Sequence, residues 1–256
     1  MGLLDWFRRK EGPAPGRNAG GAGPAVPRAL ERNIKRLLNK HLHSEERWGA
    51  IQAVAEDPSD AAVDALIRRF GIHVEPSAVD NEEKDYIADA LASRGEAIVP
   101  RLTKSLRRSE SVTWQVRVLG RIVPRDALCN LLVELLGEFD TEYERSPERK
   151  IQVVMALAEF PGDEVAKAVA RFLGDVNETV RFQAVSTIGS IRGETAREAL
   201  IELFLRDESV RIRTAVLDLL VETGWLVHGH RGAVEKALPP GYVVDRAGAI
   251  RKRPKG

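Results

Sequence analysis

Apolar residues recur at helical spacing along most of the chain, and this pattern itself repeats. Residues 173–221 overlay on themselves after a shift of 32 positions. The matched pairs are Val180 with Ile212, Arg181 with Arg213, Ala184 with Val216, Val185 with Leu217 and Ile188 with Leu220. A repeat of this length that contains two short amphipathic helices is typical of a helical solenoid, in which each unit packs on its neighbours. The pattern therefore predicts an all-α fold.

The same register continues toward the N-terminus. With Arg181 as the reference, each unit has one reference residue, and small or aliphatic residues follow it three, four and seven positions later. The six reference residues are Arg47, Lys84, Gln115, Lys150, Arg181 and Arg213. We expect about six helical hairpins over residues 28–238, wound into a right-handed superhelix. The two longer spacings between reference residues predict loop insertions at Gly71–Asp80 and Glu138–Pro147.

Residues 1–10, ahead of this solenoid, form a candidate amphipathic arm with apolar residues on one face and basic residues at its end. The apolar residues are Leu3, Leu4, Trp6 and Phe7, and the basic residues are Arg8, Arg9 and Lys10. Nine of the 17 residues at 11–27 are Gly or Pro, which predicts a flexible linker. The arm suits the surface of an anionic membrane, and it also suits docking on a partner protein or on the solenoid itself. In its pattern it resembles the N-terminal membrane-targeting helix of the bacterial cell-division topological specificity factor.

An extended basic strip is expected at residues 239–256. Pro239-Pro240-Gly241 should end the last helix, because proline and glycine do not continue one. Tyr242–Val244 and Ala249–Arg251 are two short runs that suit a small hairpin. We expect this hairpin to cover the last repeat.

The formal net charge of +1 conceals a segregation of charge along the chain. Residues 1–43 carry nine basic and three acidic residues, and residues 240–256 carry five and one. The body between these ends therefore carries a net charge of −9. An acidic body argues against a solenoid surface that follows phosphates, so nucleic acid is not the expected partner. The single cysteine, Cys129, favours a reducing compartment, and we expect a cytoplasmic protein.

The residues around Arg181 resemble a known repeat. Asp175, Val180-Arg181, Ala184-Val185 and Ile188-Gly189 look like the HEAT repeat, particularly the short variety named after phycobilisome lyases. In that family an aspartate and an arginine stack between repeats as a polar ladder. The resemblance implies that Asp175, Arg181, Asp207 and Arg213 form this ladder here. HEAT arrays serve as scaffolds, lyases and DNA-repair enzymes alike, so the resemblance predicts the fold rather than the function.

One column on the helices that carry the reference residues is more apolar than a solvent-facing position should be. It lies one position after each reference residue, and four of its six members are large and apolar. These four are Trp48, Val116, Ile151 and Phe182. On the concave face of a solenoid, such a stripe suits an extended peptide or an amphipathic helix of a partner protein. Packing between stacked helices is the alternative explanation of the same column.

No motif for catalysis, metal ligation or cofactor binding stands out in the sequence, so we expect no catalytic residue, no metal and no cofactor. The leading hypothesis is a non-enzymatic scaffold or adaptor that holds a protein segment on its concave face. The arm at residues 1–10 would hold it at the inner face of a membrane or on a second partner. A nucleic-acid-binding or DNA-repair protein that uses the basic first helix and the basic tail is the alternative. An enzyme of the HEAT-like lyase type is the third hypothesis.

Overall fold

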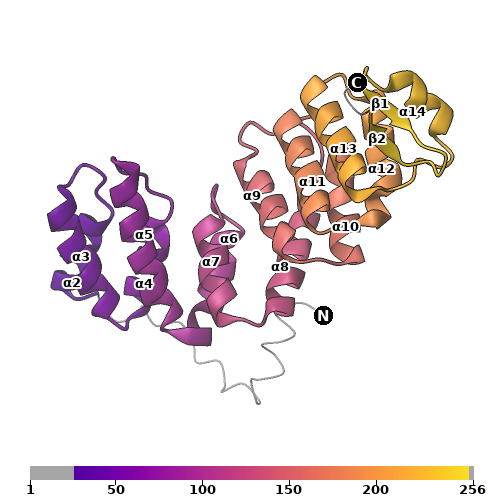
Figure 1. Cartoon of the computed structure of the whole chain (residues 1–256). Helices are drawn as coiled ribbons and strands as arrows, with labels where there is room; N and C mark the ends of the chain where they lie inside the picture. Colours follow the sequence, from indigo (N-terminus) through magenta and orange to yellow (C-terminus); the bar gives the residue numbers. More distant parts are fainter. Residues whose placement is uncertain (1–25, 254–256) are drawn as a thin grey trace, which may run out of the picture. The chain divides into compact units, whose positions relative to one another are not determined.

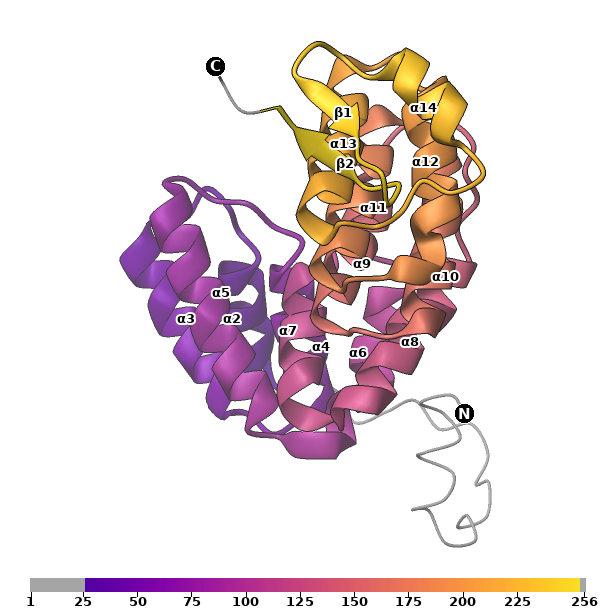
Figure 2. The same cartoon turned by 45° about the vertical axis from the view of Figure 1, so that its right-hand side comes forward.

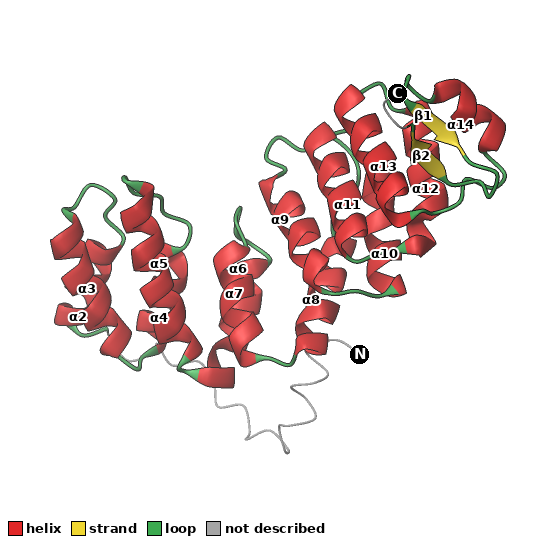
Figure 3. Ribbon diagram, in the orientation of Figure 1, coloured by secondary structure: helices red, strands yellow, loops and turns green. Residues whose placement is uncertain are grey.

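The computed structural model describes residues 26–253 of the chain. The arm at residues 1–10 and nearly all of the linker lie outside the described residues, as do the last three residues. Within the described part, the chain forms 13 α-helices, four short 3-10 helices and one two-stranded sheet (Figures 1 and 3). It divides into two compact units at Leu131 and Leu132.

The first unit is built of antiparallel helix pairs that stack in two layers (Figure 1). One layer consists of α2 (Arg28–Leu37), α4 (Asp60–Arg69) and α6 (Val99–Leu106), the last preceded by the 3-10 helix η1 (Gly95–Ile98). The other consists of α3 (Ser44–Glu56), α5 (Ser77–Ala92) and α7 (Thr113–Ile122). Helix α8 (Arg125–Gly137) contains the division between the two units.

Aliphatic side chains at the positions that the sequence pattern assigns to the core are buried between these layers. Ile51, Leu66, Ile87 and Leu91 are fully inaccessible to solvent. Their burial removes apolar surface from water, which stabilises short helices that would be marginal in isolation. The layers of the first unit therefore depend on packing against each other.

The insertion expected at Gly71–Asp80 is shorter than the sequence suggests. Helix α5 begins at Ser77, directly after Pro76, so the last four residues of the expected loop are helical. The carboxylate of Asp80 lies in the first turn of α5 and bonds to Arg69 and Lys84. These contacts hold the segment in the helix, and periodicity alone does not reveal them. The other expected insertion, Glu138–Pro147, contains no helix or strand.

The second unit repeats the two-layer arrangement. One layer consists of α9 (Glu148–Ala156), α11 (Glu178–Ser190) and α13 (Val210–Thr223). The other consists of α10 (Asp163–Ala170) and α12 (Arg197–Arg206), with the 3-10 helices η2 (Leu157–Glu159), η3 (Arg171–Gly174) and η4 (Glu194–Ala196) at the turns. Side chains cap the helices of the first layer: Asn177 accepts hydrogen bonds from the first turn of α11, and Ser209 accepts one from Ile212 of α13. Gly193 lets the turn approach α10 closely, because a Cβ atom there would lie 2.7 Å from the Cβ of Ala166.

The second unit closes with helix α14 (Arg231–Ala237) and a hairpin of β1 (Tyr242–Val244) and β2 (Ile250–Lys252). The strands pair antiparallel, with Val243 opposite Arg251. The hairpin packs against α13 (Figure 2), and the amide of Val227 donates a hydrogen bond of 2.8 Å to the carbonyl of Gly248. Ala249 and Ile250 are buried, so the strip covers the last helix pair.

This architecture confirms the prediction of an all-α fold of stacked helical hairpins. The right-handed superhelix and the number of six repeats stay predictions.

Candidate binding surfaces

Two of the three reference residues of the first unit, Arg47 and Lys84, belong to a buried charge cluster. The cluster consists of Arg47, Arg69, Asp80, Glu83 and Lys84. Glu83 accepts hydrogen bonds from Arg47 Nε at 2.9 Å and from Arg69 Nη2 at 2.6 Å. Asp80 accepts hydrogen bonds from Arg69 at 2.8 Å and from Lys84 at 2.6 Å. None of the five side chains is more than 8% exposed. The cluster links the first part of α3 and of α5 to the last residue of α4.

Burial shifts the ionisation of this cluster. Desolvation lowers the pKa of the Lys84 ammonium below its ordinary value of 10.5, against the opposing effect of its hydrogen bond to Asp80. Desolvation alone would raise the pKa of Asp80. Hydrogen bonds from Lys84 and Arg69 outweigh it and hold the pKa of Asp80 below 3.8. The carboxyl group of Asp80 is therefore ionised at neutral pH, and its role in the cluster is structural.

Ion pairs join neighbouring repeats of the second unit at residues of the ladder that the family resemblance implies. Lys150 Nζ donates to Asp175 Oδ2 at 2.9 Å, and Arg181 Nε donates to Asp207 Oδ2 at 2.7 Å. Each cation thus contacts the aspartate that precedes the next helix of its layer. Arg181 also donates to the main-chain carbonyl of Asp175, at 2.9 Å. The fourth residue of the expected ladder, Arg213, donates to the carbonyl of Ala237 at 3.0 Å.

Trp48 lies half-buried at the edge of a small cavity in the first unit. The cavity has a volume of about 330 Å³ and is lined by Trp48, Ser44, Glu45, Val79, Glu82 and Glu83. The ring of Tyr86 packs on Trp48 with 5.0 Å between the ring centroids. Glu45 and Glu82 are exposed, and neither forms an ion pair within residues 26–253. An indole wall beside two such carboxylates suits an apolar or cationic side chain.

Phe182 lies half-buried in a groove between α11 and α13 of the second unit. The groove has a volume of about 410 Å³, and Val185, Gly189 and Leu219 supply apolar contacts beside Phe182. The guanidinium of Arg211 lies 3.9 Å from the centroid of the Phe182 ring. On the rim of this groove, Asp218 and Glu222 pair with Lys252 and Arg192 at the exposed surface.

The other two members of the predicted column are also half-buried. Val116 lies on α7 of the first unit, and Ile151 lies on α9 of the second. The structure therefore places all four column residues on the helix layers that carry the reference residues, two in each unit. Partial burial fits both explanations of the column, because such a side chain contacts its neighbours and still offers surface to a ligand.

The remaining predicted sites are the arm and the basic ends. The arm residues Leu3, Leu4, Trp6, Phe7, Arg8, Arg9 and Lys10 lie outside the described residues. On the first helix, Lys35 pairs with Glu31 at 2.8 Å and Arg36 pairs with Glu46 at 2.9 Å. At the C-terminal strip, Arg251 and Lys252 pair with Asp245 and Asp218, both at 3.1 Å. These carboxylates offset part of the positive charge that a nucleic-acid surface would need.

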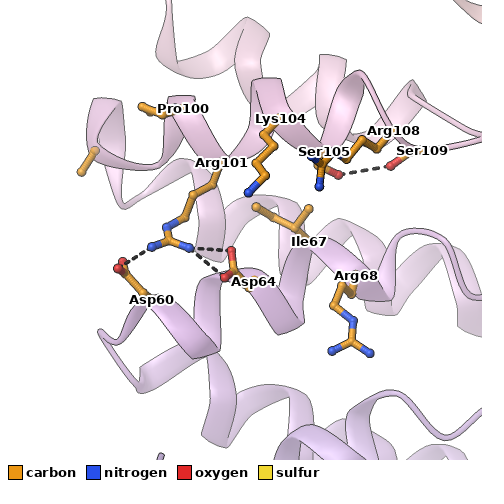
Figure 4. A pocket seen from close by; sticks show the side chains of 11 residues that line it. Asp60, Asp64, Ile67, Arg68, Pro100, Arg101, Lys104, Ser105, Arg108 and Ser109 are labelled. Atoms are coloured by element: carbon orange, nitrogen blue, oxygen red, sulfur yellow. Dashed lines mark hydrogen bonds and ion pairs between the residues drawn. The ribbon is translucent and has the colours of Figure 1, made fainter. Parts of the chain in front are cut away.

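A third hollow, between α4 and α6, is not indicated by any pattern in the sequence (Figure 4). We call it the α4–α6 groove, and its volume is about 870 Å³. It is lined by Asp60, Asp64, Ile67, Arg68, Ala97, Pro100, Arg101, Lys104, Ser105, Arg108 and Ser109. At one end Arg101 donates to Asp64 at 2.7 and 2.8 Å and also pairs with Asp60. The other end contains Lys104, Arg108 and the two serines.

Among residues 26–253, no group of three or more His, Cys, Asp or Glu side chains is arranged to hold a metal ion. None of the helices in the same range is both long and apolar enough to cross a bilayer.

Both units consist of antiparallel helix pairs that stack on one another, and ion pairs join neighbouring pairs. This arrangement defines the class of α-solenoid repeat proteins. Residues 141–220, which include α9 to α12 and most of α13, match the family model of the HEAT repeats. The chain therefore contains HEAT repeats over residues 141–220, as the residues around Arg181 indicate. No curated protein matches the chain. The assignment to the short phycobilisome-lyase variety stays a prediction.

Proposed function

We propose that the chain is a non-enzymatic scaffold that binds a protein segment on the helices that carry the reference residues. These are α3, α5 and α7 in the first unit and α9, α11 and α13 in the second. HEAT repeats generally mediate protein–protein interaction and scaffolding. The observation that carries the proposal is that Trp48 and Phe182, two of the column residues, each line a hollow beside other apolar side chains. Half-buried aromatic residues of this kind supply much of the binding energy at protein interfaces.

The charge of this layer indicates which segment it takes. Helices α3 and α5 carry eight acidic residues and two basic ones, and Arg47 and Lys84, the basic ones, are buried in ion pairs. The carboxylates of Glu45 and Glu82 flank Trp48 without a cationic partner among the described residues. A segment with an aliphatic anchor and flanking Lys or Arg residues fits this arrangement, because the anchor fills the hollow and the cations meet the carboxylates.

A peptide library displayed on phage tests this binding. Selection on the full chain should enrich peptides with a large apolar residue next to Lys or Arg. Binding of these peptides should fall at least about tenfold in Trp48→Ala or Phe182→Ala, which removes an interface anchor. Thr214→Ala is the control, because Thr214 is the exposed member of the same column. Selected peptides that bind both variants as tightly as the wild type would overturn the proposal, provided that the variants unfold at the wild-type denaturant concentration.

The proposal places the scaffold in the cytoplasm, with residues 1–10 as an anchor on the inner face of a membrane. Four apolar residues next to Arg8-Arg9-Lys10 support this role, because apolar burial and attraction to anionic lipid add together. Co-sedimentation with vesicles that contain anionic lipid measures it. Deletion of residues 1–10 should abolish pelleting of the protein with these vesicles. Equal pelleting of the full and the shortened chain would exclude the anchor.

A further inference from the structure

The α4–α6 groove offers positive charge that the protein itself does not neutralise. Lys104 and Arg108 line the groove, and the side chain of neither forms a hydrogen bond or ion pair with any described residue. Figure 4 shows the Lys104 ammonium and the Arg108 side chain on the α6 side of the groove, near Ile67 of α4. Arg68 adds a third such cation at the edge of the groove. The remaining cation, Arg101, is already bound by two carboxylates.

Two serine hydroxyls lie beside these cations. Ser105 Oγ and Ser109 Oγ are 3.1 Å apart, so one of them donates to the other. The side-chain amide of Gln115 donates to both oxygens, at 3.4 and 3.1 Å. Both hydroxyls therefore accept a hydrogen bond from Gln115, and only one hydroxyl proton is used between them. The second proton is left to donate to a ligand in the groove.

We propose that the α4–α6 groove binds a phosphoryl group carried by a protein segment. Lys104 and Arg108 supply the charge, and the Ser105–Ser109 pair supplies a hydroxyl donor. A phosphate monoester carries about 1.5 to 2 negative charges at neutral pH and has three strong acceptor oxygens, so it matches two cations and a hydroxyl better than one carboxylate does. The site goes beyond the proposed function, because it lies in the helix layer opposite to the predicted column.

The other end of the groove distinguishes a protein segment from a nucleic acid. Asp60 and Asp64 line that end, and Arg101 offsets only one of their two charges. A phosphate backbone that continued along the groove would be repelled there. A peptide carries one phosphoryl group and continues with neutral or basic residues, so the carboxylates favour it. Ile67 and Pro100 also offer apolar contact to the side chain next to the phosphorylated residue.

The layer around the groove has the charge that such a ligand needs. Helices α2, α4 and α6 carry eight basic and three acidic residues. This excess attracts an anionic segment over a distance on the order of the 10 Å Debye length. Lys104 lies in the last turn of α6 and Arg108 two residues after its end, where positive charge also stabilises the helix. A test of binding therefore needs a parallel measurement of unfolding.

The test uses the full chain and fluorescence anisotropy of a labelled octapeptide that contains one phosphoserine among glycines. The wild type should bind this peptide at least about tenfold more tightly than the unphosphorylated version, because charge-assisted hydrogen bonds are lost without the phosphate. Lys104→Gln/Arg108→Gln should bring the affinity for the phosphopeptide to that of the unphosphorylated version. Arg32→Gln/Lys40→Gln is the matched control, since it also removes one arginine and one lysine charge, but from exposed positions outside the groove. It should change the affinity less than about twofold.

Three results would overturn the proposal. The first is equal binding of the phosphorylated and unphosphorylated peptides by the wild type. The second is wild-type affinity in Lys104→Gln/Arg108→Gln, or an equal loss in the control variant. The third is tighter binding of a short DNA duplex, or of inorganic phosphate, with the same dependence on Lys104 and Arg108, because the groove would then recognise nucleic acid or free phosphate. Chemical denaturation of each variant checks the fold, and Lys104→Arg keeps the charge and should retain binding if the double variant is destabilised.

Discussion

The buried charge cluster makes a sharp prediction about the stability of the first unit. Glu83→Gln keeps the shape of the side chain and removes its negative charge. The substitution leaves the guanidinium groups of Arg47 and Arg69, both at most 2% exposed, facing a neutral amide that also places a donor toward them. Breaking one partner out of a buried ion pair costs about 3–5 kcal/mol, mainly because the remaining charge is buried without compensation. We expect a loss of about this size in the free energy of unfolding.

Urea denaturation followed by circular dichroism and tryptophan fluorescence measures this loss. With a denaturant dependence of about 2 kcal/mol/M, the unfolding midpoint should fall by on the order of 2 M. Glu82→Gln is the matched control, since Glu82 is the exposed neighbour, and it should stay within about 0.5 kcal/mol of the wild type. Adding Arg47→Met to Glu83→Gln should restore part of the loss, because it removes one stranded charge. A loss below about 1 kcal/mol in Glu83→Gln, or a double variant less stable than the single one, would refute this reasoning.

Three further predictions concern single side chains. The pKa of Asp80 is lowered in the folded protein, so ionised Asp80 stabilises the fold fully above pH 3.8, and this stabilisation is lost as the pH falls through the lower native pKa. Asp80→Asn should therefore reduce the dependence of the free energy of unfolding on pH in the acid range. An unchanged pH dependence would contradict this. Gly193→Ala places a methyl group 2.7 Å from the Cβ of Ala166 and should cost about 1–3 kcal/mol in thermal or urea unfolding, whereas Gly232→Ala has open space and should not destabilise. Burial, with a smaller contribution from a neighbouring carboxylate, raises the pKa of the Cys129 thiol above 9.0. A thiol reagent at pH 7 should therefore modify the native protein more slowly than the urea-unfolded protein, and equal rates would exclude this protection of the thiol.

The helices were predictable because their core positions follow one register. Val180, Ala184 and Ile188 are all fully buried, as the overlay of residues 173–221 requires. The start of α5 was not predictable in this way. Ser77–Asp80 is helical because Asp80 bonds to Arg69, which lies 11 residues earlier on another helix. Hydrophobic periodicity reports which face of a helix is buried, and it carries no information on such a long-range ion pair.

The ladder shows a similar limit of sequence reasoning. The family resemblance marks Asp175, Arg181, Asp207 and Arg213 as a ladder between repeats, but the motif does not say which side chains pair. In the structure the carboxylate of Asp175 bonds to Lys150 and Arg181 bonds to Asp207, so the contacts span 25 and 26 residues. In the first unit the corresponding acid is Glu83, directly before its own reference residue. These pairings are set by how the helices stack, and a register read along the sequence does not contain them.

The α4–α6 groove was not predictable from the sequence, because the net charge of a stretch of sequence does not show which helices share a layer. The body is acidic as a whole, yet α2, α4 and α6 carry an excess of basic residues and α3 and α5 an excess of acidic ones. Successive helices alternate between the layers, so basic and acidic helices alternate along the sequence. The two kinds of helix are separated into different layers only when the hairpins stack. Segments of opposite charge would therefore bind opposite layers of the first unit. Trp48 and Lys104 lie in different layers, and a scaffold with this arrangement can hold two partners at once without competition between them.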